Sequence, residues 1–286
     1  MSVPAKHPDE IPGLSSLIDR YDAFFLDQYG VLHDGSAPYP GALDCLEKLS
    51  VAGKQVVILS NSGKRAAENE ARMARLGFDV SRWNLFLSSG EAAWRIFAQA
   101  LADGRIISGA KCYLISRDND RSAVSSLDLE SAADPGIADI ILISASEGDR
   151  RDLAYYKRLL KGAAAKRTPC YCTNPDRVML TPDGPKFGAG RIAELYESLG
   201  GDVTYIGKPY AAIYDAALSA AGSPSRDRVL CVGDSVEHDI AGAAGAGLGS
   251  ALVRTGIGTA KSGVELTRDY KTFGARPDFV LPGFIW

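Results

Sequence analysis

Histidine is scarce in this sequence, and the scarcity limits the kinds of metal site that the chain can build. The 286 residues include only three histidines, His7, His33 and His238, which are widely separated along the chain. Three scattered histidines therefore argue against a histidine-cluster metal site. Carboxylate oxygens are the natural alternative, and they favour Mg²⁺.

Cysteine offers neither a disulfide framework nor a metal site. The five cysteines are odd in number and scattered. The closest two, Cys170 and Cys172, have one residue between them, which is not the spacing of a redox or zinc pair. We expect all five to be reduced, as in a cytoplasmic protein.

The sequence also lacks an excess of basic residues and any long apolar run. Its formal net charge of -3 shows no excess of lysine and arginine, so nucleic acid is not an expected partner. No stretch approaches the length of a membrane span. Residues 1–10 lack the positively charged segment followed by an apolar segment that is typical of a signal peptide. We expect a cytoplasmic protein with neither nucleic-acid nor membrane partners.

What the sequence does contain is an alternation of short apolar runs with helical segments. Apolar residues make up 46% of the chain and charged residues 23%, as in ordinary globular proteins. Strands are predicted near 23–27, 55–59 and 84–87, with a helix in each interval. This order predicts an α/β protein whose core is a Rossmann-like, doubly wound parallel sheet.

A second α/β series lies inside the first. After Ser88 the sequence predicts a helix over 91–101, and then strands at 111–115, 138–143 and 169–172. The first α/β series continues after Gly188, with core strands predicted at 203–207, 229–233, 251–253 and 279–281. The core is therefore expected to carry an inserted α/β domain.

Four of the predicted core strands lead to a polar residue, namely Asp27, Ser60, Lys208 and Asp234. Any one of these residues alone can be a turn or cap residue. Their recurrence indicates more, because ligands of open parallel sheets bind outside the carboxyl ends of the strands. Two carboxylates, a hydroxyl and an ammonium group in one crevice predict a phosphate-and-metal site.

The strand-end aspartates are the candidate metal ligands. Mg²⁺ usually takes one or two carboxylates together with phosphate and water, so Asp27 and Asp234 are expected to hold it. With the ion offsetting the repulsion between carboxylate and phosphate, Asp27 can attack phosphorus and form an aspartyl phosphate. Asp239 is expected to order this loop or a metal-bound water, or else to cap the next helix.

The remaining strand-end residues are candidates for holding phosphate. Lys208 supplies a fixed positive charge for the phosphoryl oxygens. Ser60 and Asn61, with the backbone amides that follow, can bind phosphate where a loop meets a helix N-terminus. The alternatives are a solvated lysine at a strand exit and an ordinary turn over 60–63.

Together these residues resemble the motifs of the haloacid-dehalogenase superfamily, whose members are mostly phosphatases. The resemblance narrows to class IIA, the sugar-phosphatase-like branch with a type-2 cap between the second and third motifs. It is carried by Phe25–Leu32, Leu59–Ser62, Thr173–Asp176, Tyr205–Pro209 and Val232–Asp239. The resemblance implies a hydrolase core formed by residues 1–88 and 187–286, with residues 89–186 as the inserted cap domain.

The resemblance also implies a function. It indicates a Mg²⁺-dependent phosphatase that acts through an aspartyl phosphate on a small phosphorylated metabolite of the sugar phosphate or nucleotide type. Asn174 and Asp176 lie in the segment where such caps meet the substrate, although a turn stabilised by asparagine and proline explains that segment equally well. A homodimer is compatible with the sequence.

One position departs from the family pattern. Phosphatases of this family carry a second aspartate two residues after the nucleophile, which protonates the leaving group and then activates water. Here that position is Tyr29. Its backbone carbonyl can still bind Mg²⁺, but a phenol with an ordinary pKa of about 10 is a poor acid or base at neutral pH.

Three hypotheses follow from Tyr29. The first is a magnesium phosphatase with an altered acid–base arrangement. The second is a dehalogenase-like hydrolase that acts at carbon without metal, and the third is a catalytically weak protein that binds a phosphorylated ligand. Asp234, Asp239 and Lys208 favour the first, because a metal-free dehalogenase has little need of Asp234.

Overall fold

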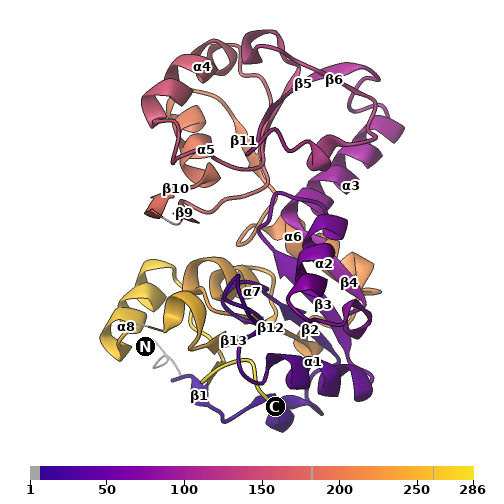
Figure 1. Ribbon diagram of the computed structural model, residues 1–286, viewed down its shortest axis with the longest axis vertical. Coiled ribbons are helices and arrows are strands. Elements are labelled where there is room, and N and C mark those ends of the chain that lie inside the picture. Colours follow the sequence, from indigo (N-terminus) through magenta and orange to yellow (C-terminus); the bar gives the residue numbers. More distant parts are fainter. Residues whose placement is uncertain (1–6, 182, 260) are drawn as a thin grey trace, which may run out of the picture. The chain divides into compact units, whose positions relative to one another are not determined.

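The structure is a computed structural model that describes residues 7–181, 183–259 and 261–286. The predicted core ranges therefore include residues 1–6 and 260, and the predicted cap includes residue 182, all of which lie outside the described residues. The chain forms two compact units (Figure 1). The core unit comprises the described residues up to Ser60, Glu70–Leu87 and Lys208–Trp286; the inserted unit comprises Asn61–Asn69 and Ser88–Gly207.

The core unit is built on a seven-stranded sheet, which confirms the α/β fold class. Its two central strands are apolar throughout and fully buried, as expected where helices cover both faces of a parallel sheet. The strand order is β1 (Asp9–Glu10), β14 (Phe279–Leu281), β13 (Gly249–Val253), β12 (Val229–Gly233), β2 (Ala23–Leu26), β3 (Gln55–Ser60) and β4 (Leu85–Ser88). The strands from β1 to β3 in this order run parallel.

The first α-helix of the core unit is amphipathic and buries one face. In α1 (Ala42–Val51), Ala42, Cys45, Leu46 and Leu49 are buried, which is the spacing of a single helical face. The other helices are α2 (Ala66–Arg75), which contains the division at Asn69–Glu70, α6 (Ala211–Ala220), α7 (Ala241–Gly245) and α8 (Gly263–Thr272). Among the described residues, no helix is long and apolar enough to cross a membrane.

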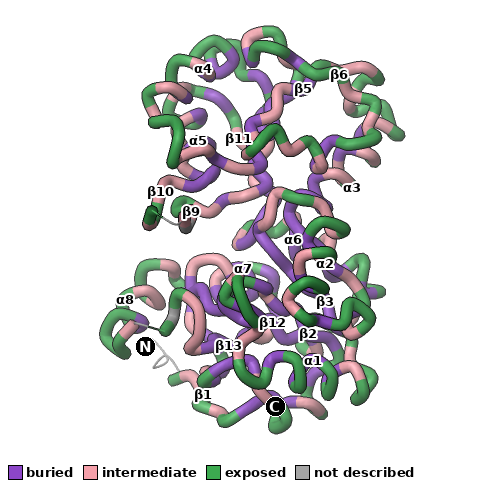
Figure 2. The backbone as a smooth tube through the Cα atoms, viewed as in Figure 1, coloured by how far each residue is buried: buried purple, intermediate pink, exposed green. Residues whose placement is uncertain are grey.

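The inserted unit has its own parallel sheet and its own hydrophobic core (Figures 1 and 2). The strand order is β11 (Val203–Tyr205), β8 (Cys170–Cys172), β7 (Ile140–Ile143), β5 (Ala110–Ile115) and β6 (Leu129–Ser131). It is accompanied by the helices α3 (Ser89–Ala102), α4 (Leu153–Ala165) and α5 (Ala189–Ser198), and by an antiparallel hairpin of β9 (Val178–Thr181) and β10 (Gly184–Phe187).

The prediction that the strand before Lys208 belongs to the core sheet is wrong. This strand, β11, pairs with β8 through Val203↔Cys170 and Tyr205↔Cys172. Helix α5 likewise contributes Ile192 and Tyr196 to the hydrophobic cluster of the inserted unit. The inserted unit therefore continues to Gly207 and does not end at residue 186, because an apolar run predicts a strand without specifying the sheet that it joins.

Candidate active site

Three neighbouring strands of the core sheet bring predicted site residues to one edge. The central order is β12, β2, β3, with Val232 opposite Leu26 and Leu26 opposite Ile58. Asp27 directly follows β2, Ser60 is the last residue of β3, and Asp234 directly follows β12. Because the strands run in one direction, all three residues lie at the carboxyl edge, where ligands of such sheets bind.

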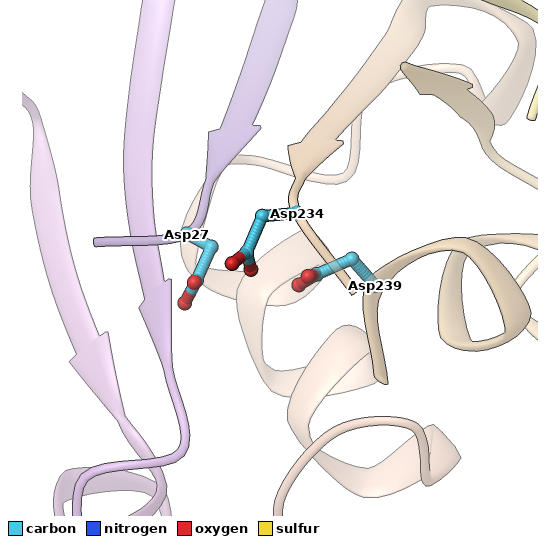
Figure 3. Close-up of side chains that lie close together, drawn as sticks. All are labelled: Asp27, Asp234 and Asp239. Atoms are coloured by element: carbon cyan, nitrogen blue, oxygen red, sulfur yellow. The ribbon is translucent and has the colours of Figure 1, made fainter. Parts of the chain in front are cut away.

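Asp27, Asp234 and Asp239 form a carboxylate cluster. One oxygen from each lies within 4.8 Å of the others. Asp239 comes from a single π-helical turn over Val236–Ile240, a local geometry that is frequent at functional sites. Figure 3 shows the three carboxylates converging from two strand ends and the turn that follows β12.

Lys208 joins two members of this cluster. Its Nζ donates to Asp27 Oδ1 at 2.7 Å and to Asp239 Oδ1 at 2.6 Å, and its side chain is almost fully buried. Although burial acts to lower it, the charges of Asp239 and Asp27 raise the pKa of Lys208 above its ordinary value. The ammonium group therefore stays charged and holds the nucleophile candidate in place.

The cluster places more carboxyl groups than ammonium groups in a buried site. Burial raises the pKa of Asp27 to about 6, against the opposing effect of the Lys208 charge. Burial, together with the charges of Asp27 and Asp239, raises the pKa of Asp234 well above its ordinary value. Within this group, three carboxylates face one ammonium group. A divalent cation would offset the excess charge, and hard carboxylate oxygens suit such an ion.

The hydrogen bonds distinguish Asp234 from Asp239. Both oxygens of Asp239 are engaged, one by Lys208 and the other by the backbone N–H of Ser235 at 3.0 Å. Asp234 accepts from the Ile257 N–H at Oδ2 alone, and its Oδ1 accepts from none of the residues that the structure describes. Asp239 is thus suited to orienting the lysine and loop, and Asp234 to binding an ion.

A loop that the sequence did not single out for the site encloses Asp234. Ile257 donates to Asp234 at 2.8 Å, and the Thr255 hydroxyl donates to the Gly30 carbonyl at 2.6 Å. Gly30 has a φ of +91°, and a Cβ there would lie 2.1 Å from Asp234 Oδ2. Only glycine fits this approach. The contact arises from tertiary structure, so neither the Thr255 nor the Ile257 role has a local sequence signal.

Tyr29 and His33 pack against each other in the loop that follows Asp27. Their rings pack edge to face with centroids 5.7 Å apart, and the Tyr29 residue is 40% exposed. His33 is fully buried, and its Nδ1 accepts from the Gly35 N–H. Burial lowers the pKa of His33 to about 4. A neutral, fully buried imidazole is poorly suited to replace the missing aspartate as an acid.

Asn61, Asn174 and Asp176 belong to the inserted unit, where the structure brings them together. The Asn61 amide donates to Asp176 Oδ1 at 2.8 Å, and the Asp176 N–H donates to Asn174 Oδ1 at 3.0 Å. Asn61 also accepts from the Ser89 hydroxyl. These bonds tie the start of the first inserted segment to the 174–176 loop.

Comparisons with known proteins agree with this geometry. The family model of haloacid dehalogenase-like hydrolases matches residues 24–130, and a HAD-hydrolase-like model matches residues 205–285. Chronophin from Mus musculus is 30% identical over 269 residues, which span 92% of this chain and 89% of chronophin. Sugar-phosphatase AraL from Bacillus subtilis (strain 168) is 28% identical, with 98% and 94% of the two chains covered.

A solved structure has the same fold over nearly the whole chain. A haloacid dehalogenase-like hydrolase from Brucella suis 1330 aligns with a TM-score of 0.81 at 25% identity, covering 96% of this chain and all of that one. The matches therefore include both the core unit and the inserted unit. The chain belongs to the haloacid dehalogenase-like hydrolases and, within them, to the class IIA-type phosphatases.

Proposed function

We propose that this chain is a Mg²⁺-dependent phosphatase that hydrolyses a small phosphorylated metabolite through an aspartyl phosphate at Asp27. The observation that carries the proposal is the cluster at the strand ends. Asp27 is held by Lys208, with Asp234 within 4.8 Å and with Ser60 at the end of the neighbouring strand.

Asp27 is the proposed nucleophile. One of its oxygens forms a bond to phosphorus while the P–O ester bond breaks, and the leaving oxygen keeps the electron pair of that bond. Water then attacks the aspartyl phosphate, which releases inorganic phosphate and regenerates the carboxylate. The Lys208 charge, 2.7 Å from Asp27, is placed to stabilise the charge that develops on the phosphoryl oxygens.

The metal is assigned to the strand-end carboxylates. Asp27, Asp234 and the backbone carbonyl of Tyr29 would hold Mg²⁺, which supplies positive charge to offset the repulsion between Asp27 and the phosphate. Ser60 would bind the phosphate beside it. Asp239 would act through Lys208 and the loop, since both of its oxygens are already engaged.

A sugar phosphate is the favoured substrate class, with a nucleotide next. A relative that matches along nearly the whole chain is named a sugar-phosphatase, which supports this order. The inserted unit is proposed to act as a cap that binds the non-phosphate part of the substrate, with Asn174 and Asp176 in its substrate-facing loop. The five free cysteines suit the reducing cytoplasm proposed for the protein.

The test is a panel of phosphorylated metabolites assayed for phosphate release with Mg²⁺ and with a chelator. The proposal predicts release that requires Mg²⁺ and is lost in Asp27→Asn. Halide release from a haloacid without metal would assign the site to chemistry at carbon instead. If the protein bound phosphate but released phosphate from none of the esters, it would be a ligand-binding protein and not a phosphatase.

A further inference from the structure

Gln28, the residue after the nucleophile candidate, is buried against Ser60. It is 5% exposed, and its Nε2 donates to Ser60 Oγ at 2.6 Å. Strand register explains the contact: Leu26 of β2 lies opposite Ile58 of β3, so the residues two positions further along meet on the same face. The Gln28 carbonyl also accepts from the backbone N–H groups of Leu32 and His33, which fixes this segment.

The direction of this hydrogen bond constrains the serine proton. A serine hydroxyl has one proton and two acceptor lone pairs. Because the Gln28 amide occupies an acceptor position, the Ser60 O–H must point toward a different group. A phosphoryl oxygen is a strong acceptor, so an amide donor behind Ser60 prepares the hydroxyl to donate to a phosphate.

Packing alone does not explain a glutamine here. The other end of the same amide, Oε1, is buried and has no hydrogen-bond partner among the residues that the structure describes. A buried acceptor without a partner lowers stability, whereas an apolar side chain of similar length would avoid that penalty. The side chain therefore keeps a polar group at a position where fold stability favours an apolar one.

We propose that Gln28 is a positioning residue that orients the Ser60 hydroxyl toward the transferred phosphoryl group. The inference rests on the proposed phosphatase function. It assigns to Gln28 no contact with the substrate, because the amide acts through Ser60. Removing the amide should weaken phosphate binding only while the serine hydroxyl is present.

A double-mutant cycle on Gln28→Met and Ser60→Ala tests this coupling. The probes are inorganic phosphate as a competitive inhibitor and p-nitrophenyl phosphate as substrate, both with Mg²⁺. Loss of a hydrogen bond to a charged group predicts that Ser60→Ala weakens phosphate about 10-fold or more, and Gln28→Met about 3–10-fold. The double variant should bind phosphate no more weakly than Ser60→Ala alone.

The control is Gln55→Met, the same substitution at the exposed first residue of β3, which should leave phosphate binding unchanged. Thermal unfolding provides a second readout, in which Gln28→Met should be at least as stable as wild type. A purely structural glutamine would instead lose stability on substitution and show the same loss of phosphate affinity with or without Ser60. That result would overturn the inference.

Gln28→Glu keeps the test decisive if Gln28→Met does not fold. A carboxylate can only accept, so Ser60 would donate to it and not to phosphate. The loss of phosphate affinity caused by Gln28→Glu should then be smaller in a Ser60→Ala background than in a wild-type background. An equal loss in the two backgrounds would reject the inference. If wild type neither binds phosphate nor hydrolyses esters, the proposed function fails together with this inference. If wild type does both and the losses are equal in the two backgrounds, only this inference fails.

Discussion

Lys208 donates to Asp27 and Asp239 of the carboxylate cluster from a nearly fully buried position. Replacing it by Lys208→Met leaves two buried carboxylates without their partner. Breaking a buried ion pair in this way should lower the free energy of unfolding by about 3–5 kcal/mol in metal-free protein. Urea unfolding with a chelator present measures this loss.

Lys48→Met is the matched control. Lys48 also pairs with an aspartate, Asp44, at 2.8 Å, but both side chains are about half exposed. An exposed pair of this kind contributes at most about 1 kcal/mol. If Lys208→Met and Lys48→Met lowered the free energy of unfolding by similar amounts, the Lys208 ion pairs would have to be solvated and the electrostatic description of the site would be incorrect.

Tyr29 should make turnover depend steeply on the leaving group. Aryl phosphates leave without a proton, whereas alkyl phosphates need one, and general acid catalysis is typically worth about 10²–10⁴-fold. Wild type should therefore hydrolyse aryl esters much faster than alkyl esters. Tyr29→Asp should narrow that gap by restoring an acid at this position.

A series of phosphate esters of graded leaving-group pKa, assayed on both proteins with Mg²⁺, measures the effect. A flat wild-type series would show that another group protonates the leaving oxygen. His33 is the nearest alternative in this loop, and its full burial argues against it.

At this scale the sequence predicted the residues that lie at strand ends and missed those that act through tertiary contacts. Asp27, Ser60 and Asp234 follow from apolar runs that stop at a polar residue. Gln28 and Ile257 carry no comparable signal, because their partners lie 32 and 23 residues away in the sequence. Only the strand register and the loop path bring those partners together.

At the scale of elements, the turn after β2 is tightly constrained by Gly30. An alanine at Gly30 would have to adopt a φ of +91° and would place its Cβ 2.1 Å from Asp234 Oδ2. Gly30→Ala should displace this carboxylate and weaken Mg²⁺ binding by about 10–100-fold, as changes around metal ligands typically do. Isothermal titration of Mg²⁺ into the purified variants measures the affinity.

Gly53→Ala separates metal-site disruption from backbone strain. Gly53 also has a positive φ, +68°, but a Cβ there meets nothing within 4 Å. This variant should lose about 1–2 kcal/mol of stability from the left-handed conformation and keep wild-type Mg²⁺ affinity. Equal Mg²⁺ affinities for the two variants would refute the steric argument at Gly30.

The elements were predicted well where an apolar run is long and buried, and poorly at edges. β2, β3 and β12 are buried along nearly their whole length, and their runs are unmistakable. β11 is only partly buried, with Thr204 exposed, and it joins the other sheet. β6 and the β9–β10 hairpin were missed, because β6 and β10 have no continuous apolar run and the run that begins β9 is only three residues long.

At the scale of the whole molecule, the described thiols are inaccessible. All five cysteines are free and buried. Burial raises the pKa of Cys45 to about 12 and that of Cys112 to about 11, so these thiols stay protonated and unreactive at pH 8. A thiol reagent should modify no cysteine in native protein and five after denaturation. Rapid modification of one thiol in the folded protein would contradict the packing described here.

Two hydrophobic cores in one chain explain why the sequence predicted an insertion but not its limits. Each unit has its own parallel sheet, and the alternation of strands and helices continues without a break through both. The limit at Gly207–Lys208 is set by which sheet β11 joins, and no local composition change marks it. Strand pairing between distant segments therefore determined the domain boundary.

The central claim is that Asp27 becomes phosphorylated during turnover. The most direct measurement is to quench the enzyme during hydrolysis of an aryl phosphate, reduce with borohydride, and identify modified residues by peptide mass spectrometry. An aspartyl phosphate is converted to homoserine, whereas a free aspartate is not. The account predicts homoserine at position 27 that requires both substrate and Mg²⁺, and Asp27→Asn should lose turnover by about 10³-fold or more, as removal of a nucleophile does. Sustained phosphate release by a folded Asp27→Asn protein would contradict it.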